Sequence, residues 1–543
     1  MFSEPAVGEK FFGREEVLEL LNKRVLALKE GYRQNVALTG PSLAGKSSII
    51  LHFLHMAKNE GFVPVYVEIV KEGFDSFANK FIATLLYNTL QRLGEDVSID
   101  ISDLLERAQR MLPKTHAAIK QVLSLVGNGE LDEAYLGLLA LTSTLKSETA
   151  LSCVVILDEF DNLENLGIKN PFLGFGKIIM VQKDTMYIVS SSRNEAIKKI
   201  ISEKLSLLFG NFEVVKVRNF DFKTSAAFLG IRFSGFDVPE VIRSFLTAFT
   251  GGNPFYLDRI TLKIKEIAAG KMSGHIEADA IADAIIELVY NANGAIHQYL
   301  INYLLSILDT KDKNFHMDVL ISIASGINKQ QEIARALKTK LQDTSKAVAH
   351  LSEIGLISKN GIFYEIEDAM LEFWLKNVYK RRRDLLIDGT FDKMTLFKKE
   401  VVSHIAGFEH DFGLAPEERI AELFNIFCGE LVAIDGKNAR LPRFTKVEVK
   451  TFADSSKAVA ASFRGNYWIA ETYKNCVNEN DIVNYIKNVK SLSVKASNRV
   501  IIPLRGIDEN AKLLAKELKL AIWDIGILNS IFGFYGKKKM VVL

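Results

Sequence analysis

The most specific chemical pattern in the sequence is a glycine-rich stretch that ends in a lysine and a hydroxyl residue. Residues 38–49 read LTGPSLAGKSSI, which fits G-x-x-x-x-G-K-[ST] at every fixed position. NVAL at 35–38 predicts a strand before it, and SSIILHFLHMAK predicts a helix after it. Glycines let a backbone wrap around a phosphate, and the N–H groups of the following helix bind the anion. The alternative is a turn that is merely rich in small residues.

The residues of this loop have separate predicted roles. Lys46 is predicted to reach the outer phosphates of a nucleotide, and Ser47 to bind Mg²⁺. The sequence therefore predicts a nucleotide site with Mg²⁺ as a cofactor. Its expected loop contacts are Gly40, Pro41, Ser42, Leu43, Ala44, Gly45, Lys46, Ser47 and Ser48.

A second pattern is CVVILDEFD at residues 153–161, a β-branched run that ends in acidic residues. Such a run is typical of a buried central strand, and open α/β sheets bind ligands at the carboxyl ends of their strands. Asp158 is predicted to hold Mg²⁺, and Glu159 to polarise the water that attacks the terminal phosphate. The alternative is an acidic cap after a buried strand.

Three further stretches predict strands of the same sheet: VPVYVEI at 63–69, MYIVSSS at 186–192 and FEVVKV at 212–217. The second runs into Arg193, which would then lie at a strand terminus beside three hydroxyls. Arg193 is predicted to stabilise charge in the transition state, and the alternative is a surface arginine. The predicted catalytic residues are Lys46, Glu159 and Arg193.

Several segments occur in an order used by a known family. FFGREEVLELL (11–21), the phosphate loop, ILDEFD, SSSR and GGNPFYL (251–257) resemble the archaeal-type ATPases of the STAND class of P-loop proteins. The Orc1/Cdc6 initiator family is similar at the first three. The sequence departs from the STAND pattern in having Ser47 in place of threonine, and in a long helical insertion over roughly 75–150.

The resemblance implies that the nucleotide is ATP and assigns further contacts to it. Phe12, Gly13 and Arg14 would border the adenine, and Asn253 and Pro254 would lie on a lid that packs on the base. By its own residues, TGGNPFYL predicts only a helix-breaking turn before a new helix. The stretch 220–305 reads as amphipathic helices, which fit such a lid.

The pattern after residue 311 predicts a helix–turn–helix with a wing. KQQEIARAL and DTSKAVAHLSEIGLI predict two helices, the second capped by Asp343 or Thr344, and ISKNGIFYEI predicts a hairpin. This module reads DNA in many proteins. The exposed face of the second helix would offer DNA contacts, and the alternative is a protein-contact domain. The expected contacts are Ser345, Lys346 and His350.

A basic run follows in LEFWLKNVYKRRRDL (371–385), which resembles the segment after this domain in archaeal ATPases. It is the densest basic patch of the chain, so it is a candidate for binding DNA phosphates. The alternative is a solvated charged face. The residues of the run are Lys380, Arg381, Arg382 and Arg383.

Residues 411–543 alternate between strand-like and helical stretches. A helix, PEERIAELFNIF, precedes two predicted strands at 443–452 and 466–475, then helix, strand, helix and strand. That order resembles the restriction-endonuclease-like, or PD-(D/E)xK, fold, which commonly closes archaeal ATPases. The resemblance implies a nuclease-related domain.

The nuclease chemistry needs an acid on one strand and Glu-x-Lys on the next, so that the side chains share one face and hold Mg²⁺. Glu471 and Lys474 have two residues between them, so a regular strand points them to opposite faces. VEVK at 447–450 has the required spacing, with Asp435 upstream. We therefore expect a degenerate motif in a DNA-binding or assembly domain, with an active nuclease as the alternative. The candidate residues are Glu448, Asp454, Glu471 and Lys474.

Composition places limits on the partners. The 543 residues carry a formal net charge of +2, so whole-chain charge predicts neither a nucleic-acid nor a membrane partner. The three cysteines lie far apart, which favours a reducing compartment without a disulfide framework or zinc site. No basic-then-apolar leader and no apolar run near the ~18 residues of a span occur. We expect a cytoplasmic protein with no membrane partner.

The resulting fold class is α/β, with a P-loop three-layer αβα core, a helical lid, a winged-helix domain and a C-terminal restriction-endonuclease-like α/β domain. The predicted bounds are 1–219 for the core, 220–305 for the lid, 306–385 for the winged helix, 386–410 for a linker helix and 411–543 for the last domain. The resemblance implies a Mg²⁺-dependent ATP-hydrolysing switch coupled to double-stranded DNA, a protein partner or homo-oligomerisation. The alternatives are an ATP-gated DNA nuclease and an Orc1/Cdc6-like DNA-loading ATPase.

Overall fold

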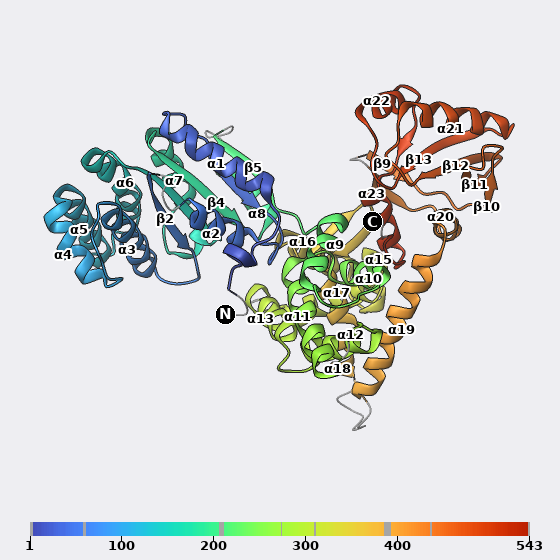
Figure 1. The fold of residues 1–543 in the computed structure, drawn as a ribbon, viewed down its shortest axis with the longest axis horizontal. Helices are drawn as coiled ribbons and strands as arrows, with labels where there is room; N and C mark the ends of the chain where they lie inside the picture. The colour runs from blue at the N-terminus through green and yellow to red at the C-terminus, as the bar shows by residue number, and fades with distance from the viewer. Residues whose placement is uncertain are drawn as a thin grey trace. The chain divides into compact units, whose positions relative to one another are not determined.

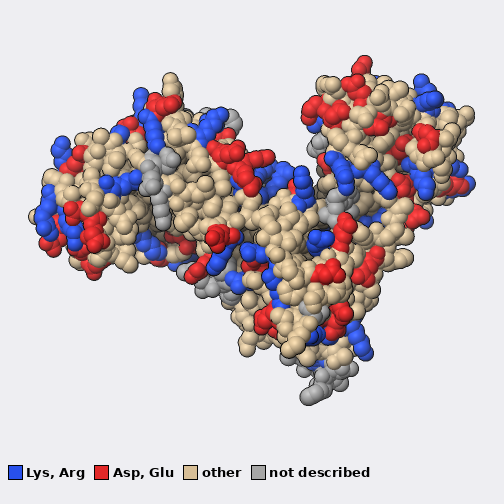
Figure 2. Space-filling view, viewed as in Figure 1, with Lys and Arg blue, Asp and Glu red and all other residues tan. Residues whose placement is uncertain are grey.

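A computed structural model describes residues 4–57, 61–205, 211–272, 274–308, 311–384, 393–434 and 437–540. The chain divides into two compact units, Met1–Asn219 and Phe220–Leu543, drawn in Figure 1. Lysine and arginine side chains are interspersed with acidic ones over the face drawn in Figure 2. None of the described helices is long and apolar enough to cross a membrane.

The first unit is built on a five-stranded sheet in the order β2-β3-β4-β1-β5. All neighbouring strands are parallel. The five stretches predicted to be strands are confirmed. Their bounds are β1 Asn35–Thr39, β2 Phe62–Glu68, β3 Ser152–Asp158, β4 Thr185–Ser191 and β5 Phe212–Lys216.

Helices cover both faces of this sheet. Successive residues of β3 enter different cores: Val154 packs with α1 (Glu15–Lys29) and α2 (Lys46–Met56), whereas Val155 packs with the helices on the other face. This alternation is what a strand with both faces buried requires. The predicted three-layer αβα P-loop core is therefore confirmed.

The insertion between β2 and β3 is helical, as expected. It consists of α3 (Phe74–Arg92), α4 (Ile101–Met111), α5 (Pro113–Gly127) and α6 (Leu131–Thr149). The remaining helices of the unit are α7 (Pro171–Val181) and α8 (Asn194–Lys199).

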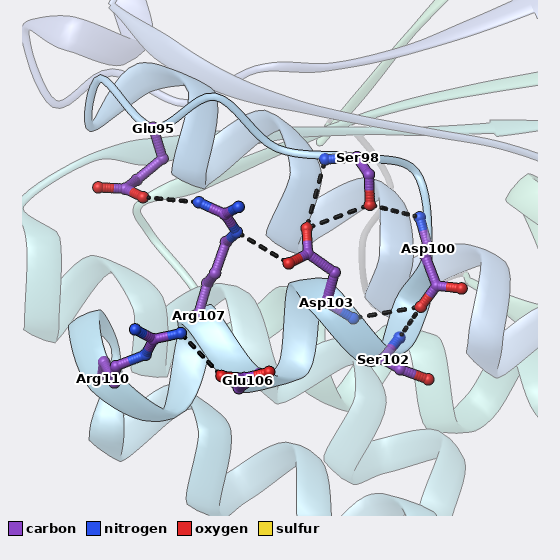
Figure 3. Close-up of polar contacts among 8 residues, drawn as sticks. All are labelled: Glu95, Ser98, Asp100, Ser102, Asp103, Glu106, Arg107 and Arg110. Carbon is purple, nitrogen blue, oxygen red and sulfur yellow. Dashed lines mark hydrogen bonds and ion pairs between the residues drawn. The ribbon is translucent and has the colours of Figure 1, made fainter.

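Polar contacts around α4, drawn in Figure 3, fix the start and the outer face of this helix. Asp100 caps it by accepting hydrogen bonds from the backbone N–H groups of Ser102 and Asp103. Arg107 forms ion pairs with Glu95 and Asp103, each at 3.0 Å. Partly exposed pairs of this kind contribute little stability, so burial of the opposite, apolar side carries most of the packing energy.

The second unit begins with helices. They are α9 (Phe222–Arg232), α10 (Glu240–Thr250), α11 (Pro254–Gly270), α12 (Ala278–Ile285), α13 (Ala295–Ile307), α14 (Lys313–Ala324), α15 (Gln330–Ala336) and α16 (Leu341–Glu353). The antiparallel hairpin of β6 (Ile357–Asn360) and β7 (Phe363–Ile366) follows. After it come α17 (Ala369–Trp374), α18 (Lys380–Asp384) and α19 (Lys393–Gly413).

The cap predicted for the helix that is now α16 was wrong. The helix begins at Leu341, and the residue that precedes it, Lys340, makes no side-chain cap. Thr344 is buried inside the helix, where its hydroxyl contacts the hydroxyl of Thr339 at 3.1 Å. Its side chain therefore serves packing at the turn between α15 and α16 rather than capping.

The C-terminal part carries a mixed sheet in the order β10-β11-β12-β13-β14. Strands β10 to β12 pair antiparallel, and β12 to β14 pair parallel. The bounds are α20 Pro416–Asn425, β8 Leu431–Ile434, β9 Lys437–Arg440, β10 Lys446–Thr451, β11 Lys457–Phe463, β12 Asn466–Tyr473, α21 Glu479–Ser491, β13 Ala496–Pro503, α22 Glu509–Glu517, β14 Ala521–Ile522 and α23 Ile525–Phe534.

Sequence reasoning missed β11. The stretch KAVAASF is rich in alanine, a residue depleted in strands, so its propensity gave little signal. The strand is buried between β10 and β12, where small side chains fit beneath the covering helices. Tertiary packing therefore overrode local propensity.

Candidate active site

The phosphate loop connects the buried strand β1 to α2, and two glycines are required by its geometry. A Cβ atom on Gly40 would lie 2.0 Å from the backbone oxygen of Val217, the residue after β5. Gly45 has a φ of +96°, a conformation that side chains rarely adopt. The two fixed glycines of the motif are thus required for different reasons. Gly40 is needed because the segment at Val217 approaches closely, and Gly45 because its backbone adopts a positive φ.

Lys46 is the first residue of α2 and is 5% exposed. Its Nζ atom donates hydrogen bonds to the backbone oxygens of Gly40 and Pro41, each at 2.9 Å. Burial lowers the pKa of Lys46, and the carboxylates of Glu159, Asp158 and Asp161 oppose this change. The loop thus presents a lysine whose charge is matched by the acidic segment after β3.

The hydroxyl of Ser47 donates a hydrogen bond to Oδ2 of Asp158 at 2.7 Å. The phenol of Tyr66, on β2, donates to the same oxygen at 3.0 Å. Sequence reasoning missed Tyr66; its only signal was a phenol in a stretch predicted to be a strand of the same sheet. These contacts bring the loop, β2 and the end of β3 together.

The donor set suits Mg²⁺. This ion prefers oxygen ligands and usually binds one or two protein groups together with substrate phosphates and water. Ser47 and Asp158 supply a hydroxyl and a carboxylate oxygen in direct contact. No group of three or more His, Cys, Asp or Glu side chains that could hold a metal occurs among the described residues. Ser47 and Asp158 are therefore the residues that would hold the ion.

Three successive serines at the end of β4 each bind a different carboxylate of the acidic segment. The hydroxyl of Ser190 donates to Asp158 and that of Ser191 to Asp161, the latter at 2.6 Å. Ser192 donates to Glu159 through its hydroxyl and, at 3.2 Å, through its backbone N–H. The parallel pairing of β3 and β4 aligns Leu157 with Val189, so both strands end together.

Glu159 leaves β3 in the left-handed conformation, with φ of 52°. Non-glycine residues adopt this conformation uncommonly, and strain of this kind clusters at functional sites. Burial raises the pKa of Glu159, Lys46 opposes that rise, and the charges of Asp158 and Asp161 add to it. A carboxylate with a raised pKa next to a phosphate loop is suited to accept a proton.

Arg193 follows the three serines and binds the same acidic segment. It forms an ion pair with Asp161 and donates to Oδ1 of Asn162 at 3.2 Å. Its side chain is about 38% exposed. Arg193 therefore lies beyond the carboxyl end of β4, held by two side chains of the segment that follows Glu159, and its catalytic role stays a prediction.

The N-terminal segment that carries Phe12, Gly13 and Arg14 packs on the phosphate loop and α2. Arg14 has a φ of 71°, and its guanidinium donates to the backbone oxygens of Ala44 at 3.1 Å and Arg218 at 2.6 Å. The ring of Phe11 stacks on His52 of α2 at a centroid distance of 4.0 Å. Arg14 thus connects the phosphate loop to the segment that follows β5.

The loop, the Ser47–Asp158 contact and the parallel sheet together define a nucleotide-binding core. Residues 10–168 match the family model described as the AAA ATPase domain. This AAA ATPase domain contains the loop and the acidic strand, so the predicted P-loop ATPase core is confirmed. The serines of β4 and Arg193 lie beyond the matched residues.

Solved structures from archaea and bacteria are similar to part of the chain. The Walker-type ATPase of Pyrococcus abyssi has 18% sequence identity and a TM-score of 0.48, with 69% of this chain and 99% of that chain covered. The ORC2 protein of Aeropyrum pernix has 14% identity and a TM-score of 0.42, covering 75% of this chain and 98% of its own. RuvB of Thermotoga maritima has 13% identity and a TM-score of 0.34, covering 69% and 98%. No curated protein matches the sequence.

Asn253 and Pro254 belong to the second unit, whereas the AAA ATPase domain lies in the first. Asn253 caps α11 by accepting hydrogen bonds from the backbone N–H groups of Phe255 at 3.0 Å and Tyr256 at 3.5 Å, and Pro254 is the first residue of that helix. The predicted helix-breaking turn is therefore confirmed. Contact of these two residues with a nucleotide stays a prediction.

Only one of the three DNA-contact candidates on α16 is exposed. Ser345 accepts a hydrogen bond from the side chain of Gln330. The ring of His350 lies 4.9 Å from that of His316, between centroids. Lys346 is exposed. DNA contact through α16 stays a prediction, and Lys346 is the side chain available to make it.

The basic run around α18 binds residues of its own chain. Arg381 pairs with Glu400, Arg382 donates to the backbone oxygen of Tyr290, and Arg383 pairs with Asp318. Lys380 donates to Ser325 at 3.3 Å. The partners lie on or next to α13, α14 and α19, so the run holds α18 against helices distant in sequence.

The four nuclease-like candidates separate into three places. Glu448 pairs with Lys446 and Lys450 on its own strand. Lys474 follows β12 and lines a cavity beyond the strand end. Asp435 lies outside the described residues.

Glu471 and Asp454, by contrast, lie close enough to interact. Glu471 is 3% exposed and accepts a hydrogen bond from Tyr473 at 2.9 Å. Burial raises its pKa to about 7, and the charges of Asp454 and Asp481 act in the same direction. Strand register places Glu471 opposite Ala458, which in turn lies opposite Lys450. The position of the lysine in Glu-x-Lys is taken by Tyr473.

Proposed function

We propose that this chain is a Mg²⁺-dependent molecular switch that binds and hydrolyses ATP. The 2.7 Å contact between Ser47 and Asp158 carries the proposal, because it joins the phosphate loop to the acidic strand end. In this proposal Lys46 binds the outer phosphates, Ser47 and Asp158 hold Mg²⁺, and Glu159 takes a proton from the attacking water. Bound Mg²⁺ would neutralise charge on the phosphates.

Arg14 is the proposed link between nucleotide state and the rest of the chain. Its guanidinium binds one backbone oxygen in the phosphate loop and another at Arg218, just before the second unit starts at Phe220. A change in the loop on ATP binding or hydrolysis would thus reach the connection between the units. Phosphate-dependent ordering of segments is a common way for P-loop proteins to switch.

The proposed output of the switch is DNA binding or self-assembly through the second unit. Residues 306–385 would act as a winged helix, in which Lys346 on α16 is exposed. Residues 411–543 would act as a restriction-endonuclease-like domain that does not cleave, because Tyr473 stands where the chemistry needs a lysine. Loading on DNA in the manner of Orc1/Cdc6 is the alternative use of the same parts.

The test is ATP hydrolysis by the full chain, with and without double-stranded DNA. We expect Lys46→Ala to lose nucleotide binding, and Glu159→Gln to retain binding while hydrolysis falls by about 10²-fold or more. Lys23→Ala and Glu164→Gln change exposed residues of the same unit and serve as controls. Hydrolysis that survives Glu159→Gln would contradict the proposal. If DNA accelerates hydrolysis, DNA binding is the output of the switch. A hydrolysis rate that DNA does not change would favour self-assembly.

A further inference from the structure

A cavity of about 580 Å³ lies within the second unit, and the ATPase proposal does not use it. Its walls come from the junction of α19 and α20 and from the ends of β12 and β13. Sites for small ligands in proteins are commonly 300–1,000 Å³ in volume. The cavity is therefore large enough for a molecule the size of a mononucleotide.

Two basic side chains enter the cavity from the carboxyl ends of adjacent parallel strands. Lys474 follows β12, and Arg505 follows β13 by two residues. The backbone N–H of Leu504 donates to the oxygen of Tyr473 at 2.9 Å, which keeps the two strand ends in register. Open α/β sheets place their ligands at this edge. Both side chains are exposed and so accessible to a ligand.

A third basic side chain, Arg419 on α20, lies in the wall and is 8% exposed. Its guanidinium lies over the ring of Phe532, 5.1 Å from the centroid, and donates to the backbone oxygen of Lys538. Burial lowers its pKa while Asp411 and Glu422 oppose this, yet an arginine keeps its charge in proteins. A guanidinium fixed in this way is preorganised to bind phosphate oxygens.

The balance of charge in the cavity favours an anion. The acidic lining residues are Glu240 and Asp411, and Asp411 is paired with Lys538 at 3.6 Å. The lining thus carries three basic side chains against two acidic ones, an excess of one positive charge. The remaining wall is largely apolar and includes Phe412, Leu414 and Met540.

We propose that this cavity binds a small phosphorylated molecule. Arg419, Lys474 and Arg505 would hold its phosphate, and the wall at Phe412 and Leu414 would contact its apolar or aromatic body. The site belongs to the second unit and is separate from the phosphate loop, so it stands or falls independently of the ATPase proposal. Lys474, predicted to belong to a nuclease site with Glu471, is here a ligand-binding residue.

The test uses the full chain carrying Lys46→Ala, the variant expected to lose nucleotide binding at the phosphate loop. AMP and inorganic pyrophosphate are titrated by calorimetry, and Lys474→Glu is compared with Lys490→Ala, an exposed lysine of α21 in the same sheet domain. We expect about one equivalent of AMP to bind, pyrophosphate to compete with it, and Lys474→Glu to weaken binding at least tenfold. The combination Lys474→Ala with Arg505→Ala should do the same.

Three results would overturn the proposal. The first is no saturable binding of either probe, and the second is equal affinity in Lys474→Glu and Lys490→Ala. The third is binding of a DNA duplex that depends on Lys474 without any binding of AMP or pyrophosphate, which would make the cavity a contact for nucleic-acid phosphates. Far-ultraviolet circular dichroism of each variant excludes unfolding as the cause of lost binding.

Discussion

Ser192 binds Glu159 with two donors, its backbone N–H and its hydroxyl, so both carboxylate oxygens of Glu159 are engaged. The two residues directly follow the neighbouring strands β4 and β3 and lie 33 positions apart in the chain. A carboxylate held at both oxygens has a fixed orientation. The proposed proton acceptor is therefore positioned by the serine that follows β4.

Hydrolysis should fall as the pH decreases through the raised pKa of Glu159. Burial disfavours the charged carboxylate, so Glu159 takes up a proton at a higher pH than an ordinary glutamate, and only the deprotonated form can accept one from water. A pH–rate profile at saturating ATP should show an acidic limb above the usual carboxyl range near pH 4.5. An acidic limb at or below pH 4.5 would contradict this.

Ser192→Ala should move the acidic limb of the pH–rate profile for ATP hydrolysis to higher pH. The serine hydroxyl stabilises the charged carboxylate and so lowers the pKa of Glu159, against the effect of burial. Loss of orientation should also reduce the rate at neutral pH by about tenfold. Ser191→Ala is the matched control, because Ser191 binds Asp161 instead. An unchanged limb in Ser192→Ala would exclude the positioning role.

Arg382→Ala should reduce stability, whereas Lys346→Ala should not. Arg382 donates to the backbone oxygen of Tyr290, and its guanidinium lies over the Tyr290 ring at 5.4 Å. Loss of a charge-assisted bond to a partly buried carbonyl costs about 2 kcal/mol, which calorimetry detects as a lower unfolding temperature. Weaker duplex binding by Arg382→Ala at an unchanged unfolding temperature would instead identify the basic run as a DNA surface.

The region around Glu471 should lose stability as the pH rises from about 4.5 to about 7. The folded-state pKa is about 7 and the ordinary value is 4.5, so over this window the folded state retains a proton that the unfolded state releases. The full effect is up to about 3 kcal/mol. Hydrogen exchange of β12 amides in the unmodified chain and in Glu471→Gln measures it. Equal pH dependence of exchange in the two proteins would contradict a raised pKa for Glu471.

The phosphate site was largely determined by local sequence. The fixed residues of the loop have local physical causes: the positive φ at Gly45 and the first turn of α2 at Lys46. The acidic strand could also be predicted, because a continuous β-branched run that ends in carboxylates indicates a buried strand with a functional end. The residue types and their spacing were enough to predict both the phosphate loop and the acidic strand.

The pairing of side chains from different strands required the tertiary structure. Nothing in the sequence assigns Ser190, Ser191 and Ser192 to separate carboxylates, because the register of β3 against β4 is set across more than thirty residues. Tyr66 was missed for the same reason. Its contact with Asp158 depends on β2 being the neighbour of β3.

The second unit shows most clearly where prediction from the sequence ends. The sequence alone determined that a basic run follows residue 379 and that Glu471 and Lys474 have the wrong spacing for a nuclease motif. Only the tertiary structure decided that Arg382 binds a backbone oxygen 92 positions away, and that Lys474 lines a cavity. The sequence fixes the charge of each group, but the fold chooses its neighbours. Those neighbours decide whether a charge is free for a ligand or used within the protein.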